Sequence, residues 1–258
     1  MLLKEKVIFL TGGSDGIGLC CAKAYAAAGA NVVLCARTES KAKHEASQLP
    51  GPGTHFGIRC DVSVGQEVAE AIRFTLDKFD RLDAIHNNAG IGSPASALHE
   101  TSEEEWDAVF GINLKSVYWT TRYGIEALKA SKGCILNTSS MVGVIGQERH
   151  AAYTATKGAM NTLTKSMALD YAPLGIRVNA VCPAGTWTPM LREFAEAQPN
   201  PAAMEDYLNR IHALGYCPEG DVIADASLFL ISDQARFVTG HIMHVSGGAE
   251  LGYRRIED

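Results

Sequence analysis

A tyrosine and a lysine stand four residues apart, at Tyr153 and Lys157, with Ser140 thirteen residues before the tyrosine. On a helix, residues with this spacing share one face, so a phenol and an ammonium group would lie side by side. A free tyrosine ionises near pH ~10, and burial raises that value, so a tyrosine that works as a base at neutral pH needs a cation beside it. An ammonium about 4 Å away, at an effective dielectric of about 20, supplies roughly 4 kcal/mol, or about three pKa units. The pattern indicates proton transfer at a hydroxyl group, with Ser140 donating a hydrogen bond that positions the reacting oxygen.

The same spacing also occurs on ordinary amphipathic surface helices, so the elements around these residues matter. Short β-branched runs alternate with helical stretches along the chain, which is typical of strand–helix units wound into a parallel sheet. The predicted strands are Val7–Thr11, Asn31–Ala36, His55–Cys60, Leu82–Asn87, Cys134–Thr138, Arg177–Cys182 and His241–Val245, and the predicted helices are Gly16–Ala28, Ser40–Gln48, Gln66–Phe79, Glu103–Lys129, Ala151–Ala172 and Asp221–Ser232. We expect an α/β fold over residues 1–258: a single-domain doubly wound (Rossmann) fold with a seven-stranded parallel sheet flanked by helices.

The composition limits the kinds of partner that the protein can bind and the compartment that we expect for it. The chain has 258 residues, 47% of them hydrophobic, which is enough for one sizeable core. A net charge of −6 without a basic patch argues against nucleic acid and against an anionic membrane. There is no charged leader followed by an apolar core and no long apolar run, so we expect a cytoplasmic protein. The seven cysteines and eight histidines lack metal-ligand spacing, so we expect reduced thiols and no metal site.

The segment after the sixth predicted strand departs from this alternation. It contains Pro189, Pro199, Pro201 and Pro218 together with helical pieces such as Met204–Leu214. Ligands bind beyond the carboxyl ends of the strands in sheets of this kind, so we predict a substrate-covering lid at about 185–217. The alternative is a connecting loop without a role in binding.

The first predicted strand runs into a glycine-rich turn, Thr11-Gly-Gly-Ser-Asp-Gly-Ile-Gly18, and then into a helix. Glycines at such a position let backbone amides approach a pyrophosphate at the positive end of the helix. The turn is not the G-x-G-x-x-G fingerprint, and a tight connection is the alternative. We predict a dinucleotide site formed by Gly12, Ser14, Asp15, Gly16, Ile17 and Gly18.

The end of the second predicted strand bears on the choice between NADP and NAD. An acid at this point favours NAD, because it binds the adenosine ribose, whereas an arginine accommodates the phosphate of NADP. Here Ala36 is followed by Arg37, which offers bidentate donors to a phosphate. We therefore predict NADP, with NAD as the alternative; Asp15 argues mildly for NAD, and Arg37 could also be an ordinary solvated residue.

Five ordered motifs together resemble the short-chain dehydrogenase/reductase family over the whole chain. They are Thr11-Gly-x-x-x-Gly-x-Gly18, Asn87-Asn-Ala-Gly90, Asn113, Ser140 and Tyr153-x-x-x-Lys157. The resemblance implies that Tyr153 is the catalytic acid/base, that Lys157 lowers its pKa and binds the nicotinamide ribose, and that Ser140 orients the substrate. It also implies that Asn113 holds a proton-relay water near Lys157. The further cofactor-binding residues that it implies are Asp61, Val62, Asn88, Ala89, Gly90, Pro183, Thr186 and Thr188, and the family habit implies a homotetramer.

Narrower features resemble the branch that contains 17β-hydroxysteroid dehydrogenase type 14 and the L-fucose-type sugar dehydrogenases. These features are Gly146-Gln147, Trp187-Thr-Pro189 and the tail Gly247-Gly-Ala-Glu-Leu-Gly-Tyr253. The likeness implies that Gln147 and Trp187 line the substrate pocket, Gln147 as a hydrogen-bonding partner of a sugar hydroxyl. The chain departs from the family pattern at Ala184, where glycine is usual, at Ser246, where aspartate is common, and at Ala36-Arg37.

We therefore expect reversible hydride transfer between NADP(H) and a hydroxyl or carbonyl carbon of a small-molecule substrate. A sugar such as an L-fucose-like aldose or a sugar acid leads, because of Gln147 and the tail. A hydroxysteroid or other hydrophobic alcohol and a 3-oxoacyl thioester are the alternatives within the enzyme class. A non-catalytic NADP-binding sensor is the alternative from another class.

Overall fold

Seven parallel strands form the centre of the molecule. The computed structural model describes residues 1–252, so Tyr253 of the tail motif lies outside the described residues. The strands are β1 (Val7–Thr11), β2 (Asn31–Ala36), β3 (His55–Arg59), β4 (Ala84–Asn87), β5 (Cys134–Thr138), β6 (Arg177–Pro183) and β7 (Ile242–Val245). They are ordered β3-β2-β1-β4-β5-β6-β7 and all pairs are parallel. The prediction of a doubly wound α/β fold is confirmed.

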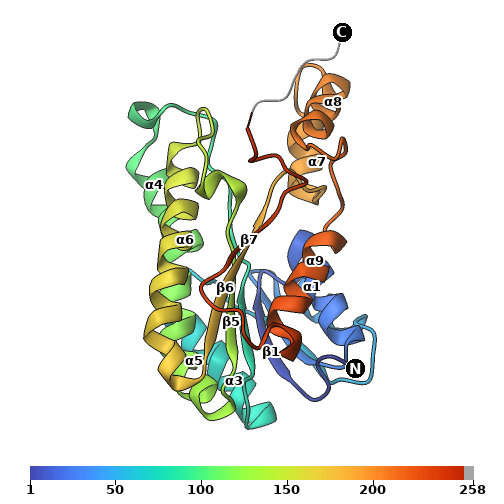
Figure 1. Ribbon diagram of the computed structural model, residues 1–258, viewed down its shortest axis with the longest axis vertical. Coiled ribbons are helices and arrows are strands. Elements are labelled where there is room, and N and C mark those ends of the chain that lie inside the picture. Colours follow the sequence, from blue (N-terminus) through green and yellow to red (C-terminus); the bar gives the residue numbers. More distant parts are fainter. Residues whose placement is uncertain (253–258) are drawn as a thin grey trace.

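Helices cover both faces of this sheet (Figure 1). The longer helices are α1 (Gly16–Ala27), α2 (Glu39–Ser47), α3 (Gly65–Phe79), α4 (Glu103–Phe110), α5 (Ser116–Ser131), α6 (Ala151–Tyr171), α7 (Pro189–Glu196), α8 (Pro201–Ile211) and α9 (Asp221–Ile231). Apolar residues of α1, α2 and α9 form one core with one face of the strands, and those of α3, α5 and α6 form a second core with the other face. The strands are thus buried on both sides, which explains their nearly continuous apolar sequences.

The chain reverses its winding direction between β1 and β4, which are neighbours in the sheet. At such a switch point the loops after the two strands separate and leave a crevice at the carboxyl edge, where ligands of these folds bind. The glycine-rich turn follows β1, and the Asn88-Ala89-Gly90 stretch follows β4. Both predicted cofactor motifs therefore lie at the place where this topology binds a ligand.

Most predicted elements agree with the structure to within two residues, but one predicted helix is interrupted. The sequence predicted a continuous helix over Glu103–Lys129, whereas the structure has α4, a π-helical turn at Gly111–Lys115 (η2), and then α5. A π turn holds an extra residue and shifts the faces of the helix on either side of it. Asn113 lies in this turn and is fully buried.

The segment predicted as a lid forms two short helices, α7 and α8, which stand beyond the carboxyl edge of the sheet (Figure 1). Prolines begin both helices: Thr188 caps α7 by accepting from the amide of Leu191, and Asn200 caps α8 by accepting from the amide of Ala203. Proline is favoured at a first helical position, where its missing N–H costs nothing. The helical piece predicted at Met204–Leu214 is therefore found three residues earlier, as Pro201–Ile211.

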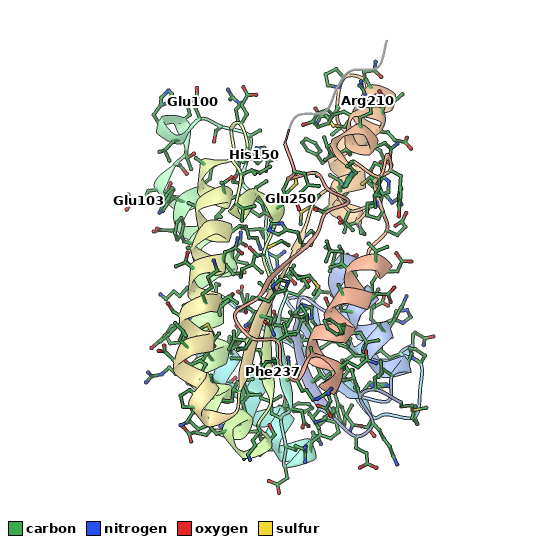
Figure 2. The ribbon with its side chains drawn as sticks, in the orientation of Figure 1. Glu100, Glu103, His150, Arg210, Phe237 and Glu250 are labelled. Carbon is green, nitrogen blue, oxygen red and sulfur yellow. The ribbon has the colours of Figure 1, made fainter. Side chains whose placement is uncertain are left out.

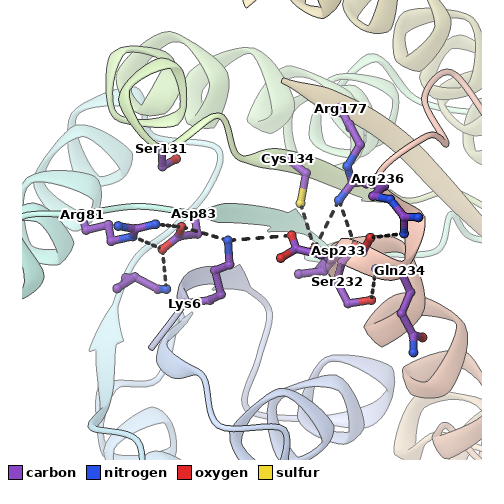
Figure 3. A network of polar contacts seen from close by, with 12 residues as sticks. Lys6, Arg81, Asp83, Ser131, Cys134, Arg177, Ser232, Asp233, Gln234 and Arg236 are labelled. Carbon is purple, nitrogen blue, oxygen red and sulfur yellow. Dashed lines mark hydrogen bonds and ion pairs between the residues drawn. The ribbon is translucent and has the colours of Figure 1, made fainter. Parts of the chain in front are cut away.

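At the opposite, amino edge of the sheet, a buried carboxylate ties the strands together (Figure 3). Asp83 accepts two hydrogen bonds of 2.7 Å from Arg81 and one of 2.9 Å from the amide of Val7. Its carboxylate lies 3.7 Å from Lys6 Nζ, and Lys6 in turn lies 3.9 Å from Asp233. The network thus joins the start of β1 to the start of β4, far from the carboxyl edge.

We expect Asp83→Asn to destabilise the protein by about 2 kcal/mol, because a buried acceptor of charged hydrogen bonds is replaced by a neutral amide that also brings unwanted donors. The measurement is the urea midpoint of unfolding. Asp233→Asn is the matched control: its side chain is 82% exposed, so its pairing with Lys6 is worth about 0.5 kcal/mol or less. Equal effects of the two substitutions would contradict the structural role of Asp83.

All seven cysteines are free, and six of them are buried. Within residues 1–252 the helices are too short or too polar to traverse a bilayer.

Candidate active site

Ser140, Tyr153, Lys157 and Asn113 come from three different elements and meet at the carboxyl edge of the sheet. Ser140 follows β5, Tyr153 and Lys157 lie in the first two turns of α6, and Asn113 lies in the π turn between α4 and α5. Figure 1 shows the start of α6 at the same end of the molecule as α7 and α8. Helices α7 and α8 and the candidate catalytic residues therefore share one edge of the sheet.

Tyr153 is partly buried, and this burial raises the pKa of its phenol above the usual value of 10. A hydrogen bond with Ser140 lowers the pKa and offsets part of that rise. The ammonium of Lys157 lies 5.6 Å from the centre of the phenol ring. Burial is thus the largest influence on the pKa of this phenol in the structure, and the lowering of that pKa by Lys157 remains a prediction.

The ammonium of Lys157 has a backbone partner in this structure. Its Nζ donates a 2.8 Å hydrogen bond to the carbonyl oxygen of Thr138, at the end of β5. The side chain is buried, with the residue 4% exposed, and desolvation lowers its pKa from 10.5 to about 8. An ammonium so buried retains donors for further acceptors, which is what holding a ribose would require.

Asn113 uses its side chain to hold the backbone after β4. Its Oδ1 accepts a 2.8 Å hydrogen bond from the amide of Ile91, and its Nδ2 donates a 2.9 Å hydrogen bond to the carbonyl of the same residue. A Cβ added at Gly90 would lie 3.3 Å from Asn113 Oδ1 and 3.8 Å from Lys157 Nζ. Asn113 and Lys157 therefore face the same small space above Gly90.

Ser140 is 9% exposed and is anchored between two neighbouring strand ends. Its Oγ approaches the carbonyl of Pro183 at 3.5 Å and accepts a 3.4 Å hydrogen bond from the amide of Val142. The first contact is long, so the hydroxyl hydrogen remains available to Tyr153 or to a substrate oxygen. Pro183, predicted from the family pattern to contact the cofactor, thus lies beside the candidate catalytic serine.

The glycine turn is compact and leaves no room for side chains at two of its positions. A Cβ at Gly18 would lie 2.1 Å from the carbonyl oxygen of Gly12 and 2.5 Å from Asn88 Nδ2. A Cβ at Gly12 would lie 2.9 Å from Ala89 Cα, and its φ of +64° is itself a glycine conformation. Backbone that must pass so close to Asn88 and Ala89 can also approach a phosphate closely, as a dinucleotide site requires.

The rest of the turn begins α1 and adjoins the lid. Asp15 is the N-cap, accepting a 2.8 Å hydrogen bond from the amide of Gly16, and Ile17 follows in the first turn of the helix. Ser14 is 7% exposed. A Cβ at Gly16 would meet the Thr188 methyl group at 3.2 Å, so the base of the lid lies next to the turn.

Charged side chains surround the place where the second and third strands end. Arg37 is exposed, and its charge lowers the pKa of Asp61, although hydrogen bonding from Ser63 is the larger cause. Val62, next along the chain, is buried. Lys41, which sequence analysis did not single out, forms an ion pair with Asp15. Asp15, the carboxylate that favoured NAD in the sequence, is thus paired with the positive charge of Lys41.

The two residues predicted to line the substrate pocket have different surroundings. Gln147 is exposed on the loop before α6. Trp187 packs on the small core of the lid, and the guanidinium of Arg192 stacks 5.0 Å from its ring centre. Thr186 is buried nearby, 5% exposed. The indole therefore contributes to the packing of α7 and α8.

The departure at Ser246 has a counterpart four residues later. Ser246 Oγ donates a hydrogen bond to the carboxylate of Glu250, which also lies 3.8 Å from His244 Nδ1. The position where aspartate is common thus has a carboxylate beside it, supplied by the tail. Figure 2 shows Glu250 between His150, at the start of α6, and the helices α7 and α8. No signal in the sequence pointed to this pair.

Comparison with known proteins decides the family. A family model described as enoyl-(acyl carrier protein) reductase matches residues 12–250. The chain belongs to the short-chain dehydrogenases/reductases. It is 39% identical to L-fucose dehydrogenase of Bos taurus over 250 residues, 97% of this chain and 91% of that protein. It is also 39% identical to cyclopentanol dehydrogenase of Comamonas testosteroni, over 95% of this chain and 97% of that protein.

A solved structure of similar fold carries a cofactor. The 3-ketoacyl-(acyl-carrier-protein) reductase of Brucella melitensis, complexed with NADH, superposes with a TM-score of 0.89 at 32% identity, covering 96% of this chain and 99% of that one. The protein is therefore an oxidoreductase that acts on CH–OH groups with a nicotinamide cofactor. The residues present fit such a group, because the glycines at 12 and 18 let the turn pack closely against Asn88 and Ala89 at the carboxyl edge, and the turn leads into the positive end of α1.

Proposed function

We propose that this protein is an NADP(H)-dependent dehydrogenase of a sugar hydroxyl, an L-fucose-like aldose or a sugar acid. The observation that carries the proposal is the joint placement of Ser140, Tyr153 and Lys157 in a chain that is similar over nearly its whole length to L-fucose dehydrogenase. The three side chains supply the groups needed for proton transfer, and the similarity supports a sugar as the substrate.

The residues divide the proton chemistry among them. A bound nicotinamide would supply the hydride acceptor for oxidation of the carbinol carbon and the hydride donor for the reverse reduction. Tyr153 takes the proton from the substrate hydroxyl, and Ser140 holds the same oxygen by a hydrogen bond. Lys157 stabilises the phenolate as it forms, because a buried cation gains more from a nearby negative charge than an exposed one. Asn113 keeps the space above Gly90 open, where a relay water would pass the proton on.

The surroundings of the site favour a polar substrate. Gln147 lies exposed on the loop before α6, where it can hydrogen-bond a sugar hydroxyl. Arg149 of the same loop donates a 3.0 Å hydrogen bond to the carbonyl of Ala95. This hydrogen bond joins the loop before α6 to the loop after β4. We propose that α7 and α8 act as the lid over the bound substrate, with Trp187 fixing the base of the lid.

A hydrophobic alcohol is the second candidate substrate, because the chain is equally identical to cyclopentanol dehydrogenase. The decisive experiment follows reduced nicotinamide with NADP or NAD and a panel of aldoses that includes L-fucose, alongside cyclopentanol and steroid alcohols. Turnover on an aldose with higher kcat/KM than on any hydrophobic alcohol supports the proposal. Turnover on hydrophobic alcohols alone would replace it with the second candidate. Reduction of a 3-oxoacyl thioester, tested in the reverse direction, would replace both.

We propose NADP rather than NAD because Lys41 pairs with Asp15 of the glycine turn, Arg37 directly follows β2, and no acid occupies position 36. Arg37→Ala is expected to weaken NADP binding about 10-fold while changing NAD binding by less than about 2-fold, since a charged hydrogen bond to the 2′-phosphate is lost. The measurement is the Kd of NADPH and of NADH from cofactor fluorescence. An equal loss for both cofactors would show that Arg37 does not contact the phosphate.

We also propose that the protein is a cytoplasmic homotetramer. The family habit places the subunit contacts on α4, α5 and α6. Exposed apolar side chains on these helices, such as Tyr118 and Leu169, are available for such contacts.

A further inference from the structure

Three buried polar side chains form a chain of hydrogen bonds beneath the glycine turn. Tyr25 of α1 lies with its hydroxyl 2.9 Å from His86 Nδ1, and the other ring nitrogen of His86 lies 2.9 Å from Thr138 Oγ1. Thr138 Oγ1 is in turn 3.3 Å from Asn88 Oδ1. Tyr25 and His86 are fully buried, and Thr138 is 7% exposed. A tyrosine, a histidine and a threonine thus occupy positions that apolar residues would fill at lower cost.

The hydrogens in this chain can run in only one direction. Asn88 Nδ2 donates to the carbonyls of Thr11 and Gly12, both at 3.2 Å, so its Oδ1 is the atom that faces Thr138 and must accept. The single hydroxyl hydrogen of Thr138 is then used on Asn88, and Thr138 can only accept from His86. His86 must therefore carry its proton on Nε2 and accept at Nδ1 from Tyr25.

The environment keeps His86 in this neutral form. Complete burial lowers its pKa from 6.5 to about 3. Its two ring nitrogens face the Tyr25 and Thr138 hydroxyls, neither of which carries a charge at neutral pH. The ring is thus a fixed dipole between two hydroxyl groups across the whole physiological pH range.

The chain ends on the backbone of the glycine turn. The Asn88 amide lies between the two limbs of the turn, because it bonds the Gly12 carbonyl and would be 2.5 Å from a Cβ at Gly18. The Thr11 hydroxyl adds a second tie: it donates to the His86 carbonyl at 3.4 Å and accepts from the amides of Asn88 and Ala89, each at 3.0 Å. The orientation of this one amide therefore sets how far the two limbs stand apart.

We propose that Tyr25 and His86 are positioning residues for the nicotinamide dinucleotide: they fix Thr138 as a donor to Asn88, and thereby hold the glycine turn in the shape that receives the pyrophosphate. The proposal rests on the cofactor class and not on the identity of the sugar or on the choice between NADP and NAD. With the opposite tautomer of His86, Thr138 would have to donate to the ring and would leave the Asn88 oxygen without a hydrogen, at a 3.3 Å contact.

The first test reads the proton directly. In protein labelled with ¹⁵N-histidine, the His86 ring is expected to show the Nε2–H tautomer without titrating between pH 5 and 8. An Nδ1–H tautomer, or a His86 that titrates in this range, would overturn the proposal. This measurement uses the unaltered protein, so it decides even where a variant fails to fold.

The second test measures binding of NADPH and NADH by fluorescence titration, without any substrate. Thr138→Val removes the donor to Asn88 and is expected to raise both Kd values about 10-fold, whereas Thr138→Ser keeps the donor and is expected to stay within about 2-fold. Tyr25→Phe removes only the first hydroxyl of the chain and is expected to raise the Kd values about 3-fold.

Thr75→Val is the matched control, because it makes the same change of hydroxyl to methyl at a buried threonine. The Thr75 hydroxyl bonds only to the Ala71 carbonyl within α3. It is expected to leave both Kd values unchanged. If Thr138→Val lowers the melting temperature as Thr75→Val does but leaves cofactor affinity intact, the chain serves stability alone and the proposal is wrong. Loss of sugar turnover with intact NADPH binding would count against the proposed substrate and not against this inference.

Discussion

Replacing Tyr153 by Phe is expected to lower kcat by two or more orders of magnitude while the Kd of the cofactor stays within about 2-fold of the wild-type value. The ring remains and fills the same space beside Ser140, so the pocket keeps its shape. Only the group that carries the substrate proton is removed. The measurement combines steady-state turnover with a separate fluorescence titration of reduced cofactor.

Tyr171→Phe is the matched control for this substitution. Tyr171 is the last residue of the same helix, α6, and it is also partly buried. It should lose no more than about 2-fold in kcat, because it lies several turns from the reacting atoms. Turnover of Tyr153→Phe at a tenth of the wild-type rate or better would remove the tyrosine from its assigned role.

The sequence predicted the sheet well because its strands are buried on both faces. A strand such as Asn31–Ala36 is apolar from Val32 onward, and its neighbours are bounded by glycine or polar turns, so each strand can be recognised by itself. The parallel order then follows from the alternation with helices. The elements that position Ser140 and Tyr153 are thus encoded locally, and their convergence at the carboxyl edge follows from the topology.

The details that sequence analysis missed depend on contacts between distant residues. The π turn at Gly111–Lys115 has helical composition, and only the double hydrogen bond of Asn113 to Ile91 reveals its purpose. His86 was visible as a polar residue within a strand, but its partners come from α1 and β5. Spacing alone cannot bring Tyr25 and Thr138 to the same imidazole.

The pKa of Tyr153 shows a different limit. The four-residue spacing correctly predicted that Tyr153 and Lys157 share a face, and the ring and the ammonium are indeed neighbours. The upward shift of the pKa comes chiefly from burial, and the hydrogen bond with Ser140 opposes it; the spacing contains neither. A phenolate is therefore favoured only when further positive charge or hydrogen-bond donors arrive with the bound ligands.

The buried ammonium of Lys157 should make the protein less stable than it could be. Burial lowers the pKa of Lys157 from 10.5 to about 8, so keeping the group charged in the folded state at pH 7 costs roughly 3 kcal/mol. Lys157→Met removes this cost but leaves the Thr138 carbonyl without its donor, which takes back about 1 kcal/mol. We expect a net gain of about 1 to 2 kcal/mol at pH 7, together with a loss of turnover of two or more orders of magnitude.

The pH dependence of this gain follows from the direction of the shift. Between about pH 8 and the pKa of an unfolded lysine, about 10.4, the unfolded wild type binds more protons than the folded wild type, so its stability rises with pH. Lys157→Met lacks this contribution, and its advantage should therefore shrink between pH 7 and pH 9.5. Urea midpoints at the two pH values measure it, with exposed Lys165→Met as the control that should change by less than about 0.5 kcal/mol at either pH. The prediction is wrong if Lys157→Met is less stable than the wild type at pH 7, or if its stability advantage grows with pH. Either result would mean that the surroundings of Lys157 stabilise its charged form.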